Sequence, residues 1–179
     1  MAGSPAVFLD RDGILNRAIV REGKPFPPTR VEDVELLPGT VTSLRRLAEA
    51  GYILIGITNQ PDVARGIQSR ETVEAINNWI QFRLPIKEIF VCYHDRADQC
   101  ACRKPKPGLI FQAAQKYALD LSQSWMVGDR WKDIAAGQAA GLRTVFVDYH
   151  YCETYRGFPA NYSVEDTASL AEIILKGPK

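Results

Sequence analysis

The stretch AVFLDRDG, residues 6–13, decides how this chain folds and where its chemistry lies. Four apolar residues without alternation are typical of a strand that is buried on both faces of a parallel sheet. Asp10 and Asp12 follow at once, and Gly13 lets the chain turn away from the strand. One carboxylate can act as a nucleophile that shares a metal ion, while the other handles a proton. An ordinary Asp-rich turn is the alternative for this motif taken alone.

Four further apolar runs resemble the first, and amphipathic segments alternate with them. The expected strands are Ala6–Asp10, Ile53–Thr58, Ile89–Tyr93, Trp125–Asp129 and Thr144–Asp148. The expected helices are Thr40–Ala50, Arg70–Phe82, Leu109–Tyr117, Trp131–Ala140 and Val164–Leu175. This alternation predicts an α/β fold, a Rossmannoid parallel sheet with helices on both faces. Residues 14–36 carry three prolines and are expected to form a loop or flap near the site, so any cap is minimal.

Composition limits the classes of protein that remain. The 179 residues favour one domain spanning residues 1–179, and a hydrophobic fraction of 46% is enough for a single core. The 22 basic residues nearly balance 21 acidic ones, which argues against non-specific binding to nucleic acid or membranes. No secretory apolar region precedes Asp10, and no apolar run reaches transmembrane length. We therefore expect a cytoplasmic monomer with no nucleic-acid or membrane partner.

Two more motifs are expected where a strand ends or a helix begins. GITNQ, residues 56–60, ends a strand on Thr58, whose hydroxyl can hydrogen-bond a phosphoryl oxygen. Thr-Asn is also common turn chemistry, so this motif is weak alone. RKPKPG, residues 103–108, leads basic side chains into a helix start, where free N–H groups favour anions. A solvated basic turn is the alternative.

The last motif, VGDRWKD at residues 127–133, contains two acidic residues at a helix entry. Asp129 and Asp133 are four residues apart, so they can face the same way. Carboxylate oxygens from several strand ends suit Mg²⁺, although capping of the helix by acidic residues is the alternative. In open α/β sheets, ligands bind beyond the carboxyl ends of the strands, and all these motifs are expected at that edge.

The joint order of these motifs over residues 6–148 resembles the haloacid dehalogenase (HAD) superfamily of phosphatases. The resemblance implies a Mg²⁺-dependent phosphoric monoester hydrolase that works through a phospho-aspartate. It implies that Asp10 is the nucleophile and a Mg²⁺ ligand. Asp12 would be the general acid/base, and its main-chain carbonyl would also bind the metal. Asp129 would complete the metal site. Thr58 and a lysine of the basic loop would hold the phosphoryl group.

A cysteine cluster forms the remaining motif. Cys92, Cys100 and Cys102 lie within eleven residues, and His94 lies among them. Three thiolates and one imidazole make a closed four-ligand set, which is typical of structural Zn²⁺. Buried cysteines with a core histidine are the alternative. The intervening residues 95–99 are polar and would need a clamp, and free exposed thiols would invite oxidation, so we favour zinc.

This cluster, placed just before the basic motif, resembles one HAD subgroup: the D-glycero-D-manno-heptose-1,7-bisphosphate phosphatases, with the histidinol phosphatases as related enzymes. The resemblance implies removal of the C7 phosphate from a small-molecule sugar bisphosphate, in the supply of lipopolysaccharide core precursors. Lys104 would stabilise the phosphoryl group. The residues expected to contact the rest of the substrate are Asn59, Gln60, Arg103 and Arg130.

Two departures and two alternatives complete the sequence evidence. Only five residues separate His94 from Cys100, and Pro61 follows T-N-Q where the subgroup would have a small residue. A polynucleotide 3′-phosphatase is disfavoured by the near-neutral charge, and a non-catalytic binding module by the intact acidic motifs. His150 and Cys152 follow the last expected strand, away from the other motifs, and are expected to be structural or surface residues.

Overall fold

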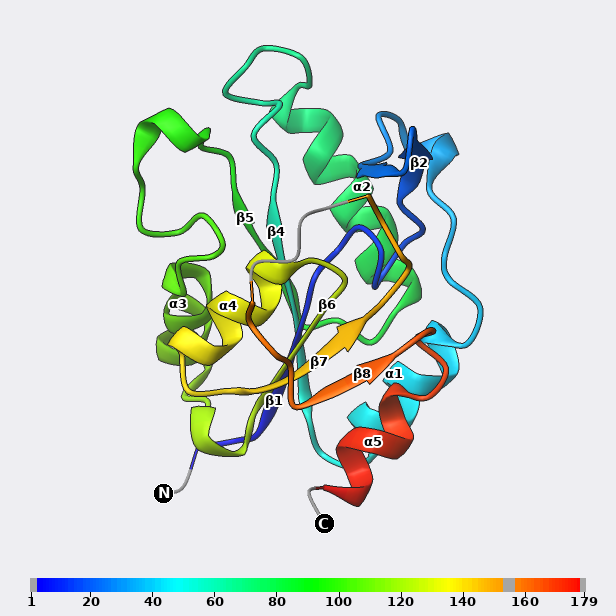
Figure 1. Cartoon of the computed structure of the whole chain (residues 1–179), viewed down its shortest axis with the longest axis vertical. Coiled ribbons are helices and arrows are strands. Elements are labelled where there is room, and N and C mark those ends of the chain that lie inside the picture. The colour runs from blue at the N-terminus through cyan, green and yellow to red at the C-terminus, as the bar shows by residue number, and fades with distance from the viewer. Residues whose placement is uncertain (1–2, 153–156, 178–179) are drawn as a thin grey trace.

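The computed structural model describes residues 3–152 and 157–177, and a six-stranded sheet with parallel pairing throughout forms its centre (Figure 1). The strand order is β5-β4-β1-β6-β7-β8. The strands are β1 (Ala6–Leu9), β4 (Ile53–Asn59), β5 (Glu88–Cys92), β6 (Trp125–Gly128), β7 (Arg143–Val147) and β8 (Tyr162–Val164). The helices are α1 (Thr40–Glu49), α2 (Arg70–Arg83), α3 (Gly108–Tyr117), α4 (Trp131–Ala139) and α5 (Leu170–Lys176). Short 3-10 helices span Val31–Asp33, Arg96–Asp98 and Leu121–Gln123.

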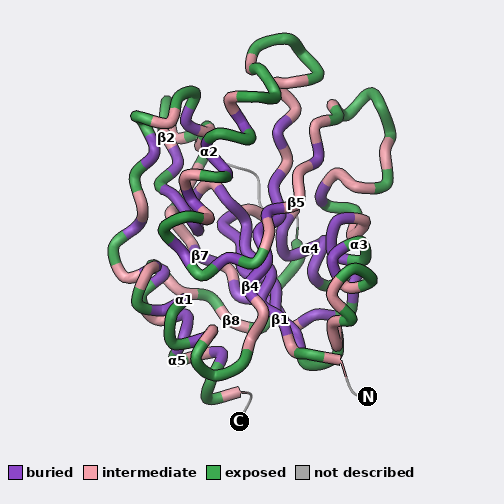
Figure 2. Tube along the Cα trace, turned by 180° about the vertical axis from the view of Figure 1, so that it is seen from behind, coloured by how far each residue is buried: buried purple, intermediate pink, exposed green. Residues whose placement is uncertain are grey.

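Helices cover both faces of the sheet because successive residues of the central strands point to opposite sides. Val7 and Leu9 of β1 belong to the core that α1, α2 and α5 cover, whereas Phe8 belongs to the core under α3 and α4. Burial in Figure 2 is continuous through the central strands. The predicted α/β sheet with helices on both faces is confirmed, and the strands are apolar without alternation because neither face meets water.

The order of the strands creates a crevice at the edge where they end. The connection after β1 leads to β4 on one side, whereas the connection after β6 leads to β7 on the other. Ligands bind at such a switch point, beyond the carboxyl ends of the two diverging strands. Asp10 and Asp129 are the first residues after β1 and β6, and the Asp10 main-chain N–H donates to the Val127 carbonyl at 3.0 Å. In Figure 1 this edge faces up, and the first and last described residues lie at the opposite edge.

Local signals explain why most elements begin and end where the sequence indicated. The Ser69 hydroxyl accepts a hydrogen bond from the Thr72 main chain and caps α2. Gly51 and Gly141 follow α1 and α4 with φ angles of 92° and 77°, the left-handed conformation that ends a helix. Every expected strand, and every expected helix before α5, starts and ends within one residue of the observed boundary. Within the described ranges, every helix is too short or too polar to span a bilayer.

The loop expected over residues 14–36 is wrong in one respect, because it contains a β-hairpin. Strands β2 (Ile19–Arg21) and β3 (Lys24–Phe26) pair antiparallel. Glu22 and Gly23 form the two-residue turn, both with positive φ, as tight hairpin turns require. Pro25 weakened the strand signal in the sequence, yet proline is tolerated in an edge strand that has one hydrogen-bonded neighbour.

The helix expected over residues 164–175 is confirmed from Leu170 onward, but its expected start is wrong, because Val164 ends a strand and a turn follows it. Residues Tyr162–Val164 form β8, which pairs with β7 at the edge of the sheet. The Asp166 carboxylate then accepts hydrogen bonds from the main-chain N–H groups of Ala168 and Ser169, and α5 begins only at Leu170. Edge pairing outweighs the helical periodicity that the sequence suggested.

The close approach of α4 to the sheet yields a test of this packing. A Cβ atom on Gly137 would lie 2.6 Å from Met126 Cβ and 2.9 Å from Thr144 Cγ2. Gly137→Ala should therefore lower the free energy of unfolding by about 1–3 kcal/mol through overpacking. Helix propensity alone would raise it by about 1 kcal/mol. Urea unfolding measures the difference, and a stabilised variant would contradict the observed helix–sheet distance.

Candidate active site

Three buried carboxylates meet in the crevice around one ammonium group. Asp10, Asp129 and Asp133 each offer an oxygen, and these oxygens lie within 4.8 Å of one another. The Lys104 Nζ lies 2.7 Å from Asp10 Oδ1 and 2.7 Å from Asp133 Oδ1, and it also donates to the Ile57 carbonyl at 3.0 Å. Lys104 is 3% exposed. The fold therefore places three potential negative charges beside the buried Lys104 ammonium.

Burial and mutual repulsion control the charges of this cluster. Burial, then the Asp133 charge, raise the pKa of Asp10 to about 7, although the Lys104 charge opposes them. Burial also raises the pKa of Asp129 well above its usual value, with Asp10 and Asp133 as further causes. Burial alone would lower the pKa of Lys104, but the carboxylates of Asp10 and Asp133 raise it, so this ammonium stays charged.

Asp12 stands outside this cluster and is held by four donors. Its Oδ1 accepts from Arg11 Nε and Asn16 Nδ2, each at 3.1 Å. Its Oδ2 accepts from Arg11 Nη2 at 3.0 Å and Gln60 Nε2 at 2.9 Å. Arg11 is completely buried, and its Nη1 donates to Asn77 Oδ1 of α2. Both oxygens of Asp12 thus have fixed directions, and its side chain keeps 16% exposure toward the crevice.

The T-N-Q motif directs its polar groups to different places. Thr58 is buried and its hydroxyl accepts from Gln60 Nε2 at 2.9 Å, so Gln60 joins Thr58 to Asp12. Asn59 instead hydrogen-bonds both main-chain groups of Lys104. The amides of Asn59 and Gln60 therefore bond within the protein, and their expected contact with substrate stays a prediction.

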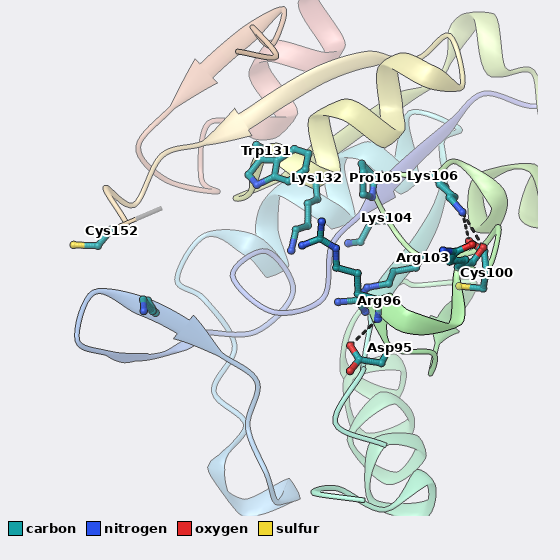
Figure 3. A pocket seen from close by; sticks show the side chains of 12 residues that line it. Asp95, Arg96, Cys100, Arg103, Lys104, Pro105, Lys106, Trp131, Lys132 and Cys152 are labelled. Carbon is teal, nitrogen blue, oxygen red and sulfur yellow. Dashed lines mark hydrogen bonds between the residues drawn. The ribbon is translucent and has the colours of Figure 1, made fainter. Parts of the chain in front are cut away.

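Two adjoining cavities open beside the acidic cluster. The first, of about 340 Å³, is lined by Asp10 and Asp12 among others. The second, of about 550 Å³, lies between the hairpin, the cysteine loop and the start of α4 (Figure 3). The side chains that line both cavities are Lys24, Arg103, Lys104 and Lys132. Arg130 lines the first cavity. Basic side chains therefore surround the space that leads away from Asp10.

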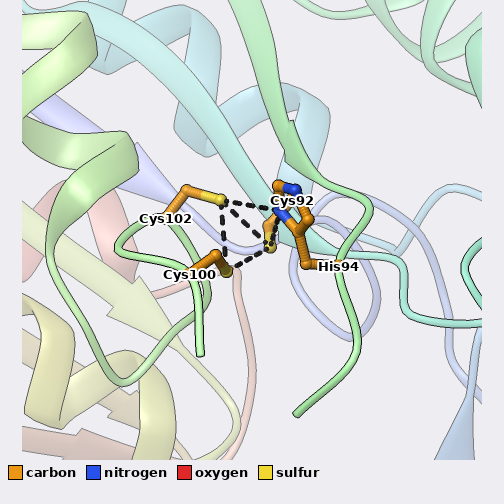
Figure 4. Close-up of side chains that lie close together, drawn as sticks. All are labelled: Cys92, His94, Cys100 and Cys102. Atoms are coloured by element: carbon orange, nitrogen blue, oxygen red, sulfur yellow. Dashed lines mark hydrogen bonds between the residues drawn. The ribbon is translucent and has the colours of Figure 1, made fainter. Parts of the chain in front are cut away.

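The cysteine cluster comes together as the sequence predicted (Figure 4). Cys102 Sγ lies 3.3 Å from Cys92 Sγ, 3.5 Å from Cys100 Sγ and 3.3 Å from His94 Nδ1. Cys92 Sγ lies 3.7 Å from both Cys100 Sγ and His94 Nδ1. Zn–S bonds of about 2.3 Å in a tetrahedron require ligand separations of about 3.5–3.8 Å. The four ligand atoms therefore lie at separations equal to these or slightly shorter, an arrangement that suits one tetrahedral metal ion.

The comparisons with known proteins agree on one family. A family model described as HAD-hydrolase-like matches residues 101–152. The D-glycero-beta-D-manno-heptose-1,7-bisphosphate 7-phosphatase of Pasteurella multocida is 34% identical, and the match covers 97% of this chain and 98% of that protein. The protein of the same name from Helicobacter pylori strain 26695 is 37% identical over 80% of this chain and 83% of its own length.

A solved structure extends the likeness to the whole fold. The D,D-heptose 1,7-bisphosphate phosphatase of B. bronchiseptica, complexed with magnesium and phosphate, is 30% identical. It superposes with a TM-score of 0.80, covering 96% of this chain and 98% of that structure. The chain belongs to this family of HAD-like phosphatases. It is accordingly a hydrolase of phosphoric monoesters, and the HAD resemblance seen in the sequence is confirmed.

The structure of this phosphatase also reveals partners that the motifs did not. Asp133 pairs with Lys104, and its other oxygen accepts from the Arg130 main-chain N–H at 3.0 Å, yet the sequence offered it only as a neighbour of Asp129. The sequence did not indicate that Arg11 would be buried beside Asp12, since arginine is seldom fully buried. Cys152 was expected away from the site, but its main-chain N–H donates to the Gly23 carbonyl at 2.8 Å and joins the hairpin turn.

The acidic cluster fits a divalent cation. Among the described residues, neither oxygen of the buried Asp129 carboxylate has a hydrogen bond of ordinary geometry. Tyr151 lies beside it, and burial, followed by interaction with the Asp129 carboxylate, raises the pKa of Tyr151. An orphaned buried carboxylate is costly unless a cation neutralises it. Oxygen ligands from Asp10 and Asp129 are those that Mg²⁺ prefers.

Mg²⁺ binding by this phosphatase should strengthen as the pH rises. A proton on Asp10 removes a ligand, and because its pKa is about 7, the proton is mostly bound below that pH. The apparent Mg²⁺ association constant should fall by about tenfold or more per pH unit below 7, because the pKa of Asp129 is raised as well. Calorimetry at pH 5.5–8, in buffers of different ionisation enthalpy, measures affinity and proton release. An affinity independent of pH would contradict this description.

Proposed function

We propose that this phosphatase hydrolyses the C7 phosphate of D-glycero-D-manno-heptose 1,7-bisphosphate with Mg²⁺ as cofactor. The relatives in the Pasteurella and Helicobacter species carry that activity in their names, and the matched B. bronchiseptica structure contains magnesium and phosphate. The observation that carries the proposal is the basic surface of the two adjoining cavities. It surrounds the space that the leaving group would occupy once a phosphoryl group lies beside Asp10.

In the first proposed step, an Asp10 oxygen attacks phosphorus. The bond from Asp10 to phosphorus forms while the bond from phosphorus to the C7 oxygen breaks. Asp12 gives its proton to that oxygen, and the alcohol leaves. Mg²⁺, held by Asp10, Asp129 and the Asp12 carbonyl, would supply positive charge that lets an anionic nucleophile approach a phosphate dianion. Lys104 and the Thr58 hydroxyl hold the oxygens of the transferring group.

In the second step, Asp12 works in the opposite direction. It accepts a proton from water, which attacks the phosphorus of the aspartyl phosphate. The bond between phosphorus and the Asp10 oxygen breaks, inorganic phosphate forms, and Asp10 is again a carboxylate. Lys104 neutralises Asp10 in the resting cluster and faces the phosphoryl oxygens during transfer, so its ammonium serves both states.

The charges at the cavity boundary favour a leaving group that is itself anionic. Lys24, Arg103 and Lys132 line both cavities, and among the described residues none of the three forms an ion pair with a carboxylate. Repulsion from Arg130 and Arg103 contributes, after burial, to the lowered pKa of Lys132. A second phosphate would relieve this crowding, whereas the ammonium of histidinol would increase it.

A substrate comparison tests the proposal. Heptose 1,7-bisphosphate, histidinol phosphate and a 3′-phosphorylated oligonucleotide are assayed with Mg²⁺, with Asp10→Asn as the inactive control. The bisphosphate should have the highest kcat/KM, and chelation by EDTA should abolish every activity until Mg²⁺ is restored. A preference for either other ester would reject the heptose assignment. Turnover by Asp10→Asn would reject the covalent step.

The proposed contact between Arg130 and the second anion makes a further prediction. Charged hydrogen bonds contribute about 1.5–3 kcal/mol each, and about 1.4 kcal/mol corresponds to tenfold in rate. Arg130→Ala should lower kcat/KM for the bisphosphate by roughly ten- to a hundredfold and affect a simple monophosphate ester much less. Arg45→Ala, at an exposed position of α1, is the control. An equal loss of kcat/KM on both esters would show that Arg130 does not recognise the leaving group.

We also propose one structural Zn²⁺ per chain, held by the cysteine cluster. Arg103 and Lys104 follow Cys102 directly, so a clamp there would fix both residues without touching phosphorus. Cys100→Ser should lose the zinc and lower the unfolding midpoint by roughly 10 °C. Elemental analysis and thermal unfolding check this, with Cys152→Ser as the control outside the cluster. Zinc-free wild-type protein purified without chelator would refute the site.

A further inference from the structure

The side chain of Asn59 joins the end of β4 to the main chain of Lys104. Its Oδ1 accepts from the Lys104 main-chain N–H at 3.0 Å, and its Nδ2 donates to the Lys104 carbonyl at 3.0 Å. A primary amide offers a donor and an acceptor side by side, so it can pair with one residue as a neighbouring strand would. Asn59 thus extends the hydrogen bonding of the sheet to Lys104, which lies in a loop and not in a strand.

Strand β4 holds Lys104 at both ends. Asn59 binds its main chain, and the carbonyl of Ile57, two residues earlier in the same strand, accepts from its Nζ at 3.0 Å. The lysine stem has four rotatable methylenes, so an ammonium is positioned only as well as the main chain from which it extends. With both ends fixed, Nζ lies at 2.7 Å from Asp10 and from Asp133.

Apart from the hydrogen bonds of Asn59 and of the Lys104 side chain, the polar contacts of this loop are made to the neighbouring cysteine loop. Lys106 Nζ donates to the carbonyls of Gln99 and Cys100, and Arg103 donates to the carbonyl of His94. These bonds tie the basic loop to the cysteine loop, residues 93–102, which reaches the sheet through its cluster with Cys92 of β5. In the part of the chain that is described, Asn59 supplies the side-chain hydrogen bonds from a sheet strand to the main chain of the basic loop.

We propose that Asn59 is a positioning residue for Lys104 and acts on the reaction only through it. Its amide fixes the main chain from which the ammonium reaches the transferring phosphoryl group. This positioning role takes the place of the contact with substrate that the sequence suggested for Asn59. The inference rests on the proposed role of Lys104 in binding that group, and it is independent of which alcohol leaves. Any phosphate ester that the wild-type enzyme hydrolyses can therefore test it.

The first experiment removes the two hydrogen bonds at nearly constant volume. Asn59→Leu should lower kcat/KM for p-nitrophenyl phosphate by roughly ten- to a hundredfold, as expected for two lost hydrogen bonds. The inhibition constant of inorganic phosphate should rise several-fold, which a smaller folded fraction could not cause. Asn59→Ala serves if the leucine variant does not fold. Asn78→Ala, at an exposed position of α2, is the matched control and should change neither value.

The second experiment asks whether the effect passes through Lys104. Calorimetry measures phosphate affinity, with Mg²⁺ present, in wild type, Asn59→Leu, Lys104→Ala and the double variant. If Asn59 acts through Lys104, adding Asn59→Leu to Lys104→Ala should change affinity by less than about twofold. An equal, additive loss in both backgrounds would overturn the proposal, as would unchanged phosphate binding in Asn59→Leu. Failure on the heptose substrate would leave this result intact.

Discussion

The arrangement of the site depends on one interaction, the buried ion pairing of the Lys104 ammonium with Asp10 and Asp133. Charges taken out of water are expensive, and removing one partner of a buried pair is expected to cost about 3–5 kcal/mol. Asp10 follows β1 directly, Asp133 lies in the first turn of α4, and the lysine comes from the loop after the cysteine cluster. Any change that displaces this loop therefore also leaves buried carboxylates unpaired at the edge of the sheet where the strands end.

The central fold was predictable because its signals are local and repeated. A strand covered on both faces must be apolar at every position, and AVFL and WMVG show this without help from the rest of the chain. The hairpin at Glu22-Gly23 and the strand Tyr162–Val164 were missed for one shared reason. Three-residue strands carry little periodicity, and each exists because a partner lies beside it, which is tertiary information.

The site residues that directly follow a strand could be predicted from the sequence. Asp10 and Asp129 end neighbouring strands, and the cysteine ligands fall within one short loop, so their approach follows from topology. The partners of those groups could not be predicted in this way. Arg11 points inward to Asp12 and Asn77, and Asn59 bonds a residue 45 positions later. Such pairings depend on side-chain directions that neither spacing nor composition contains.

The saturation of Asp12 has a consequence for the order of events in turnover. Four donors from Arg11, Asn16 and Gln60 occupy its two oxygens, which is as many as an ionised carboxylate accepts. A carboxylic acid has one acceptor position fewer, since its own proton fills it. In the proposed acid/base role, loading Asp12 with a proton therefore requires one donor to withdraw. The amides of Gln60 and Asn16 each have a second acceptor, the Thr58 hydroxyl and the Arg17 carbonyl, so either can release Asp12 and keep a hydrogen bond.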